Sequence, residues 1–295
     1  MKKIAFLLII TLVACINLMG QKRELTPARG HYKDLSVFSK KPKLHNESID
    51  QQKFPFDAAL AERRLSRKPI YLQNIKQEDF NLPEPPANSS EQTRAEINYL
   101  LRLQAQRTKL DVNTSLFMAK VYYNLSVKPG DSTYTRYRNN LFFIGRSIGT
   151  WFNPNNLPVT ADFMARVWQD ASFFIWTFKY KYLRIRPYVI DKELKNLEET
   201  DWAAYPSGHA ANSYINAYIY QELAPQFTDM FIKDAYDMAH SREILGVHFP
   251  SDSEASRIFA RQFVNRLFEN EQFKKDFEAV KKEWSEKAKE SFQTK

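Results

Sequence analysis

The pattern of apolar and polar residues after residue 87 predicts a protein built from helices. Long stretches contain neither Gly nor Pro, and their apolar residues recur at helical spacing. In the run 208–223, for example, Tyr214, Ala217 and Tyr218 approximate one helical face. No alternation typical of strands persists long enough to build a sheet. The pattern therefore predicts an all-α fold.

Start signals and periodicity place the helices along the chain. The first is expected to begin after Ser89 or Ser90 as a cap and to run through EQTRAEINYLLRLQAQRTKL. Ser251 and Glu254 form a candidate capping box, which puts Asp252 in the first turn of its helix. The remaining helices are expected at about 116–125, 132–147, 160–184, 208–223, 229–245, 252–269 and 271–290.

Residues 1–20 combine a basic start, an apolar stretch and small residues, which is the pattern of a secretory signal peptide. A membrane anchor is less favoured because Thr11 and Asn17 interrupt an already short apolar run. The end of the signal peptide has two alternatives. It is cleaved after Gly20, or a lipobox ends at Cys15 and makes the protein a lipoprotein. We expect an exported, periplasmic protein that meets a membrane only through lipidation at Cys15.

The segment 21–77 is polar, interrupted by prolines and weakly periodic. It is expected to be an irregular N-terminal arm that packs against the domain following it, residues 78–290. A chain of 295 residues can bury the core of one such domain. Because every candidate site residue lies after residue 178, the arm is expected to be dispensable for chemistry.

The formal net charge of +9 favours anionic partners such as phosphates, nucleic acid or lipid headgroups. The basic residues alternate with acids, however, as in KKDFEAVKKEWSEKAKE, where Phe273, Phe277 and Trp284 fall on one side. This is typical of a solvated amphipathic helix, so no nucleic-acid partner is expected. With one cysteine in the chain, export cannot depend on an internal disulfide.

The tetrapeptide Pro-Ser-Gly-His stands directly before one of the predicted helices. A helix start exposes unpaired N–H groups and the positive end of the helix dipole, which suit an anion. Ser207 and Gly208 alone could simply begin a helix. His209 adds a titratable group beside the candidate anion site.

Two further segments carry candidate chemistry. KYKYLRIRP places Lys179 and Arg186 at the end of a helix, and SREILGVHFPSD places Arg242 before His248 and Asp252. Each segment alone has a structural explanation: a helix stop, a surface pair, or a hydrogen bond within a turn.

Together the three segments match K-x6-R-P, P-S-G-H and S-R-x5-H-x3-D at every specified position. The chain therefore resembles the type 2 phosphatidic acid phosphatase superfamily, which includes vanadium haloperoxidases. Within it, the chain is most similar to the class A bacterial non-specific acid phosphatases. FNLPEPPANSSEQTRAEINYLLRLQAQRT and NEQFKKDFEAVKKEW extend the likeness to about residues 78–285. The resemblance implies one helical-bundle domain of the acid phosphatase / vanadium haloperoxidase type.

The resemblance also implies catalytic roles. His248 would be the nucleophile and form a phosphohistidine, while Asp252 holds its other ring nitrogen. His209 would protonate the leaving alkoxide and then activate water. The implied phosphate-binding residues are Lys179, Arg186, Ser207, Gly208 and Arg242. Three cations already neutralise the phosphate, so no metal and no cofactor are expected.

Differences from the usual class A pattern surround the motifs. Ala204 and Tyr205 precede Pro-Ser-Gly-His where the class usually has Gly-Ser, and Ala210 follows it in place of Thr. These positions belong to the pocket wall, which determines substrate preference. His240 lies outside the pattern and is expected on a helix surface.

The leading interpretation is an exported, metal-independent acid phosphatase that acts on small-molecule phosphomonoesters, with phosphotransfer to alcohols as a further activity. A lipid-phosphate phosphatase is one alternative, although such enzymes usually carry several membrane helices. A vanadium-dependent haloperoxidase is another, although its P-S-G-H and Ser-Arg segments usually lie further apart. A non-catalytic anion-binding protein is disfavoured by the complete set of acid, nucleophile and orienting carboxylate. A homo-oligomer is left open.

Overall fold

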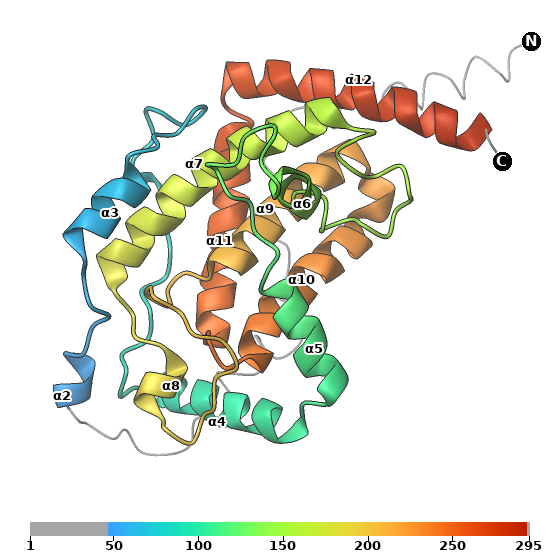
Figure 1. Cartoon of the computed structure of the whole chain (residues 1–295). Helices are drawn as coiled ribbons and strands as arrows, with labels where there is room; N and C mark the ends of the chain where they lie inside the picture. The colour runs from blue at the N-terminus through green and yellow to red at the C-terminus, as the bar shows by residue number, and fades with distance from the viewer. Residues whose placement is uncertain (1–46, 294–295) are drawn as a thin grey trace, which may run out of the picture.

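The computed structural model describes residues 47–293, with side chains to residue 287, and within this part every regular element is a helix. The all-α prediction is confirmed. Figure 1 shows α7 crossing the molecule diagonally, α12 along the top, α9, α10 and α11 in the middle, and α4, α5 and α8 below. The predicted signal peptide, Cys15 and the arm up to residue 46 lie outside the described residues.

The helices of the domain follow the predicted order. Their bounds are α4 Glu91–Gln106, α5 Lys109–Met118, α6 Tyr134–Asn140, α7 Pro158–Tyr182, α8 Pro187–Ile190, α9 Gly208–Leu223, α10 Thr228–Ile244, α11 Pro250–Leu267 and α12 Glu271–Gln293. Short 3-10 turns occupy Gln77–Asp79 and Pro225–Phe227. Ser90 caps α4 as predicted, with its hydroxyl accepting from the N–H of Thr93.

The predicted helix at 116–125 is wrong. The helix starts earlier, at Lys109, because Thr108 and Asp111 form a reciprocal capping box. It ends at Met118, and turns fill most of the stretch up to residue 133. The helix predicted at 132–147 is shortened to α6, and turns follow it to Gly145, whose φ of 91° is left-handed.

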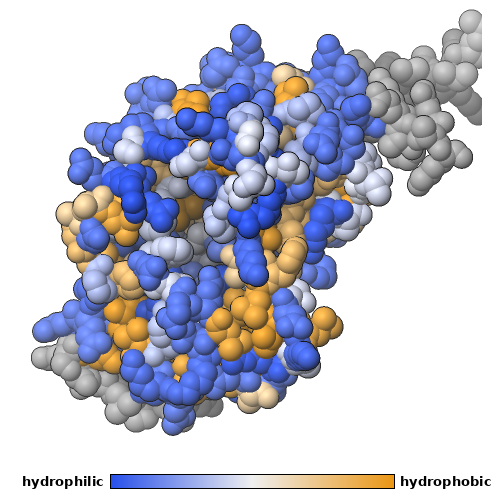
Figure 2. Space-filling model, in the orientation of Figure 1, coloured by the Kyte–Doolittle hydropathy of each residue, from blue (hydrophilic) through white to orange (hydrophobic). Residues whose placement is uncertain are grey.

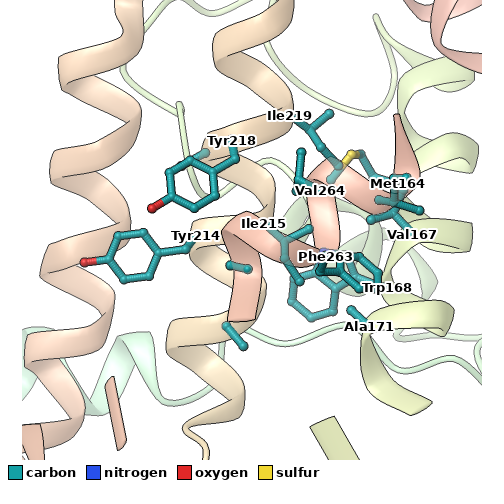
Figure 3. Close-up of a cluster of buried hydrophobic side chains, with 14 of the residues drawn as sticks. Met164, Val167, Trp168, Ala171, Tyr214, Ile215, Tyr218, Ile219, Phe263 and Val264 are labelled. Atoms are coloured by element: carbon teal, nitrogen blue, oxygen red, sulfur yellow. The ribbon is translucent and has the colours of Figure 1, made fainter. Parts of the chain in front are cut away.

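Helix α9 lies at the centre of the bundle, which explains why its sequence is apolar on most sides. It packs against α7, α10 and α11. Figure 3 shows Met164, Val167, Trp168 and Ala171 of α7, Tyr214, Ile215, Tyr218 and Ile219 of α9, and Phe263 and Val264 of α11 in one cluster. The one polar group that Trp168 buries is satisfied, since its indole N–H donates to Asn216 at 2.8 Å. The start of α9 is therefore held by the core itself.

The described part of the predicted arm contains two helices, α2 (Glu47–Asp50) and α3 (Ala58–Leu65), and α3 packs on α7. Tyr71 and Leu72, which also belong to the predicted arm, lie in the main apolar core. The buried carboxylate of Asp170 on α7 accepts the N–H groups of Ile70, Tyr71 and Leu72 at 2.5 to 2.9 Å. The boundary at residue 77 stays a prediction, but the segment just before it is part of the same core.

The surface offers few apolar groups. Figure 2 shows a largely hydrophilic face with apolar patches in its lower half, where α4, α5 and α8 lie in Figure 1. Leu110, Leu116 and Phe117 of α5 and Val189 of α8 are exposed. Among the helices of residues 47–293, none is both long and apolar enough to cross a bilayer.

Candidate active site

The structure brings all eight predicted site residues into one region. Lys179 lies in the last turn of α7, Arg186 before α8, Ser207 to His209 at the start of α9, and Arg242 in the last turn of α10. His248 lies between α10 and α11, and Asp252 in the first turn of α11. Their chemical roles stay predictions, which the contacts below make specific.

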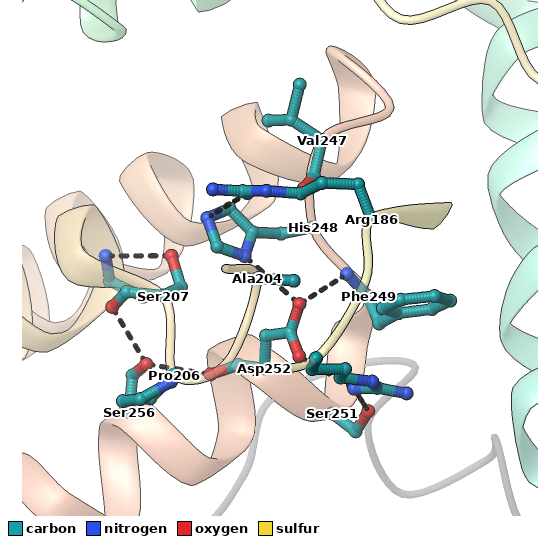
Figure 4. A network of polar contacts seen from close by, with 12 residues as sticks. Arg186, Ala204, Pro206, Ser207, Val247, His248, Phe249, Ser251, Asp252 and Ser256 are labelled. Carbon is teal, nitrogen blue, oxygen red and sulfur yellow. Dashed lines mark hydrogen bonds and ion pairs between the residues drawn. The ribbon is translucent and has the colours of Figure 1, made fainter. Parts of the chain in front are cut away.

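His248 and Asp252 form a buried pair. The Nδ1 atom of His248 lies 3.0 Å from Oδ2 of Asp252, and the side chains are 4% and 0% exposed (Figure 4). Burial alone would raise the pKa of Asp252, but Arg184 and His248 outweigh burial and hold that pKa below its usual range. Because an ionised carboxylate can only accept, Nδ1 of His248 carries the proton.

Asp252 also caps its own helix. Its Oδ2 accepts the N–H of Phe249 at 3.0 Å (Figure 4). The predicted capping box of Ser251 and Glu254 is wrong, because Ser251 binds Glu96 and Glu254 pairs with Arg257. The cap and the orienting carboxylate are thus one residue.

The other ring nitrogen of His248 faces Arg186. Nη1 of Arg186 lies 3.0 Å from Nε2 of His248, and a guanidinium can only donate, so Nε2 presents a lone pair (Figure 4). Burial, and then the charge of Arg186, lower the pKa of His248 well below its ordinary value. The imidazole is therefore neutral with Nε2 free to act as a nucleophile once the arginine contact yields.

Lys179 binds the backbone that precedes Pro-Ser-Gly-His. Its Nζ donates to the carbonyls of Ala203 and Pro206 at 2.7 Å, and to Ala204 at 3.3 Å. Burial, and then Arg186, lower the pKa of Lys179 well below its usual value. The ammonium thus shapes the turn that leads into α9, and direct contact with phosphate stays a prediction.

The guanidinium of Arg186 likewise has all of its nitrogens in hydrogen bonds with other parts of the protein. Besides His248, it donates to the carbonyls of Trp202, Ala203 and Val247 at 2.7 to 3.3 Å. This fixes its planar group across the base of the site.

Arg242 differs from the other two cations. Its side chain is 2% exposed, and its Nη2 pairs with the carboxylate of Glu198. Its Nε and Nη1 are buried and make no hydrogen bond to the described part of the chain. Buried donors without a partner are costly, typically about 1–3 kcal/mol each, so these groups favour an anion.

The start of α9 supplies the remaining predicted groups. The Ser207 hydroxyl caps the helix by accepting from Ala210, at 3.4 Å. The Ser256 hydroxyl of α11 lies 2.8 Å from the carbonyl oxygen of Ser207 and 2.7 Å from that of Asp252 (Figure 4). The starts of α9 and α11 are therefore tied together.

A Cβ added at Gly208 would meet only Ile175 among the described atoms within 4 Å, at 3.8 Å. Packing within the protein therefore does not require glycine at this position, and a close approach of its backbone to phosphate stays a prediction.

His209 is half-buried beside all three cations. Its Nε2 lies 3.1 Å from the carbonyl oxygen of Ala119. Burial lowers the pKa of His209 well below its ordinary value, and the charges of Arg242, Lys179 and Arg186 lower it further. A bound phosphate dianion would oppose these charges and raise that pKa again.

Four contributors were missed by sequence reasoning: Glu96, the Ala119 carbonyl, Arg184 and Glu198. Arg184 stood inside the KYLRIRP segment without a role. The sequence did contain a sign that Glu96 is buried, because this carboxylate lies between the apolar residues Ala95 and Ile97, and the structure buries all three. The Ala119 carbonyl and Glu198 gave none. In residues 47–293, no three His, Cys, Asp or Glu side chains gather in a way that could hold a metal ion.

The fold is a helical bundle, and its candidate site gathers two histidines, three buried basic side chains and the carboxylate of Asp252. No family model matches the chain. It is 35% identical over 118 residues to a non-specific acid phosphatase of Providencia stuartii, covering 36% of this chain and 45% of that protein. It is 26% identical over 147 residues to a non-specific acid phosphatase of Salmonella typhi, covering 48% and 58%. The chain thus spans about half the length of these curated relatives.

The fold has solved counterparts. A bacterial vanadium-dependent iodoperoxidase superposes with a TM-score of 0.53 at 16% identity, covering 80% of this chain and 63% of that one. At such identity the likeness concerns the fold alone. The curated relatives and this fold support the resemblance to the type 2 phosphatidic acid phosphatase superfamily that the sequence motifs indicated.

Proposed function

We propose that the chain is an exported acid phosphatase that hydrolyses small-molecule phosphomonoesters without a metal, through a phosphohistidine on His248. One observation carries this proposal: the buried guanidinium of Arg242 has two nitrogens, Nε and Nη1, without a hydrogen-bond partner in the described structure. Such groups favour a phosphoryl group, whose three equatorial oxygens need charge stabilisation during transfer.

The first half-reaction uses the lone pair on Nε2 of His248. Nε2 attacks phosphorus in line with the leaving oxygen, forming a P–N bond as the ester P–O bond breaks. His209 gives its proton to the departing alkoxide. The imidazole gains positive charge in this step, and Asp252 stabilises that charge through Nδ1–H.

The second half-reaction returns the enzyme to its starting state. Neutral His209 takes a proton from water, whose oxygen attacks phosphorus while the P–N bond breaks and inorganic phosphate leaves. An alcohol in place of water would give phosphotransfer. The cations around the site hold the phosphoryl oxygens in both steps.

The class of substrate is supported by the names of the relatives, which are non-specific acid phosphatases. Export to the periplasm is proposed from the sequence of residues 1–20, with anchoring by lipid at Cys15 as one form of it. A homo-oligomer also remains a proposal.

The proposal is tested by screening the purified protein against phosphomonoesters and phosphatidic acid, with and without a chelator. We expect phosphomonoester turnover that the chelator does not change. Preference for phosphatidic acid would instead favour a lipid-phosphate phosphatase. Oxidation of halide by peroxide in the presence of vanadate, exceeding phosphatase activity, would favour a haloperoxidase.

A further inference from the structure

Asp252 is shared between His248 and an arginine outside the sequence motifs. Its Oδ2 faces His248 at 3.0 Å, while its Oδ1 accepts from Nη1 of Arg184 at 2.6 Å. Arg184 is 2% exposed, and its guanidinium lies 3.9 Å from the ring centroid of Phe249. A positive charge this close cancels much of the negative charge that Asp252 presents to His248.

A second carboxylate lies on the other side of Arg184. Glu96 of α4 is 0% exposed, and its Oε2 lies 3.4 Å from Nη2 of Arg184. Its oxygens also accept from the N–H and the hydroxyl of Ser251, each at 2.9 Å. Nη1 of Arg184 in turn donates to the Ser251 hydroxyl at 2.8 Å. Glu96 is therefore tied both to Arg184 and to the residue next to Asp252.

The sum of these charges determines how much negative charge the Asp252 side presents to His248, opposite Arg186. Asp252 and Arg184 alone add to zero, whereas Asp252, Arg184 and ionised Glu96 add to one negative charge. Only the second arrangement favours the positive charge that forms on the imidazole during attack.

We propose that Glu96 is a positioning residue that acts through Arg184, holding Asp252 in place and keeping it able to stabilise positive charge on His248. This proposal rests on the nucleophilic role of His248 proposed above. Glu96 itself touches no reacting atom.

The ionisation of Glu96 makes this effect depend on pH. Burial raises the pKa of Glu96 to about 7, against the lowering effects of Arg184 and Ser251. The groups that face it are Arg184, and Ser251 and Asp252 at the start of α11. Helix α10 also packs on α4, where His240 and Glu243 contact Tyr99. Glu96 is thus protonated on the acidic side and ionised above neutrality.

The decisive variant is Glu96→Gln, which keeps the shape but cannot ionise. kcat/KM is measured from about pH 5 to about pH 8. The substrate is 4-nitrophenyl phosphate, because its leaving group needs little protonation and the titration of His209 then affects the rate least. The ratio of wild-type to variant kcat/KM should be near one at the acidic end and rise to roughly tenfold at the alkaline end. A ratio that stays constant with pH would mean that Glu96 only supports the fold.

Glu283→Gln is the matched control. Like Glu96, Glu283 accepts backbone N–H and a hydroxyl at the start of a helix: the N–H groups of Val159 and Thr160 and the hydroxyl of Thr160, at the start of α7. Its replacement should leave the shape of the pH profile unchanged. If Glu96→Gln does not fold, Ser251→Ala decides: it removes a hydrogen bond that lowers the pKa of Glu96, so the inflection should move to higher pH. No movement would overturn the proposal.

A second measurement does not depend on turnover. The ring nitrogens of His248, labelled with 15N, should show an inflection near neutral pH that disappears in Glu96→Gln. Persistence of the inflection in the variant would overturn the role of Glu96. If the inflection behaves as expected but no phosphomonoester is hydrolysed, the proposed function fails and the coupling stands.

Discussion

Nε2 of His209 lies 3.1 Å from the carbonyl oxygen of Ala119, and this contact determines which ring nitrogen is left for chemistry. A carbonyl can only accept, so Nε2 carries a proton in every state that keeps the contact. In the proposed mechanism, Nδ1 is then the nitrogen that delivers or takes up the proton at the phosphate. The loop after α5 thus does for His209 what Asp252 does for His248.

The acid role of His209 predicts a dependence on the leaving group. His209→Ala should slow an alkyl phosphate by roughly 10²- to 10⁴-fold, and 4-nitrophenyl phosphate much less, because nitrophenolate leaves without a proton. Steady-state kinetics on the two substrates measure the difference. Equal losses on both would assign His209 to binding.

The nucleophilic role of His248 predicts where phosphate becomes attached. His248→Ala should abolish turnover and any acid-labile label from radioactive substrate, since Nε2 holds the lone pair in the site. Peptide mapping after a rapid quench at neutral or alkaline pH locates the label. His240→Gln, on α10 outside the site, is the control and should still be labelled. Label on the peptide that contains His209 would reverse the two assignments.

The pH profile should favour the acidic side. The pKa of His248 is lowered by burial and by Arg186, so Nε2 stays unprotonated below the usual histidine range and attack persists there. On the alkaline side the rate should fall as His209 in the substrate complex loses its proton. The measurement is kcat against pH for an alkyl phosphate. A rate that kept rising through alkaline pH would contradict an acid role for His209.

Arg242 should control anion binding. Inorganic phosphate or vanadate should raise the Tm of the wild-type protein by several degrees, because the ligand binds only the folded site. Arg242→Gln should remove most of that shift, since the unpartnered N–H groups are lost. Arg266→Gln, which alters an exposed pair with Glu269, should leave it intact. An undiminished shift in Arg242→Gln would place the anion elsewhere.

Asp170 should link the arm to the stability of the domain. Asp170→Ala leaves the N–H groups of Ile70, Tyr71 and Leu72 without their acceptor, and should cost about 3 kcal/mol or more of the free energy of unfolding. Denaturant unfolding measures the loss. At temperatures where the variant is still folded, kcat should match the wild type, because Asp170 makes these contacts away from the site residues.

Local signals in the sequence predicted the helix starts and the set of residues that converge. Ser90 and Ser207 cap the helices that they were expected to cap, because a cap depends on residues within one turn. The capping box at Ser251 failed because a distant residue, Glu96, competes for the same serine. Similarly, the contacts of Arg184 and Lys179 join segments far apart in the chain, and no local pattern encodes them. The start of α5 was readable from Thr108 and Asp111, but the sequence pattern assigns the residues up to Leu110 to the end of the preceding helix.

The hydroxyl of Ser256 reaches the carbonyls of both Ser207 and Asp252, so α9, which carries His209, and α11, which follows His248, begin from a common anchor. A displacement of one helix start would carry the other with it, and the spacing between nucleophile and acid would be preserved. The loops at 119–133 and 191–202 lie outside this anchor and reach the site residues through Ala119, Glu198 and Trp202. New substrates are therefore expected to be accommodated by changes in these loops outside those three residues, while the reaction centre is inherited as a single piece.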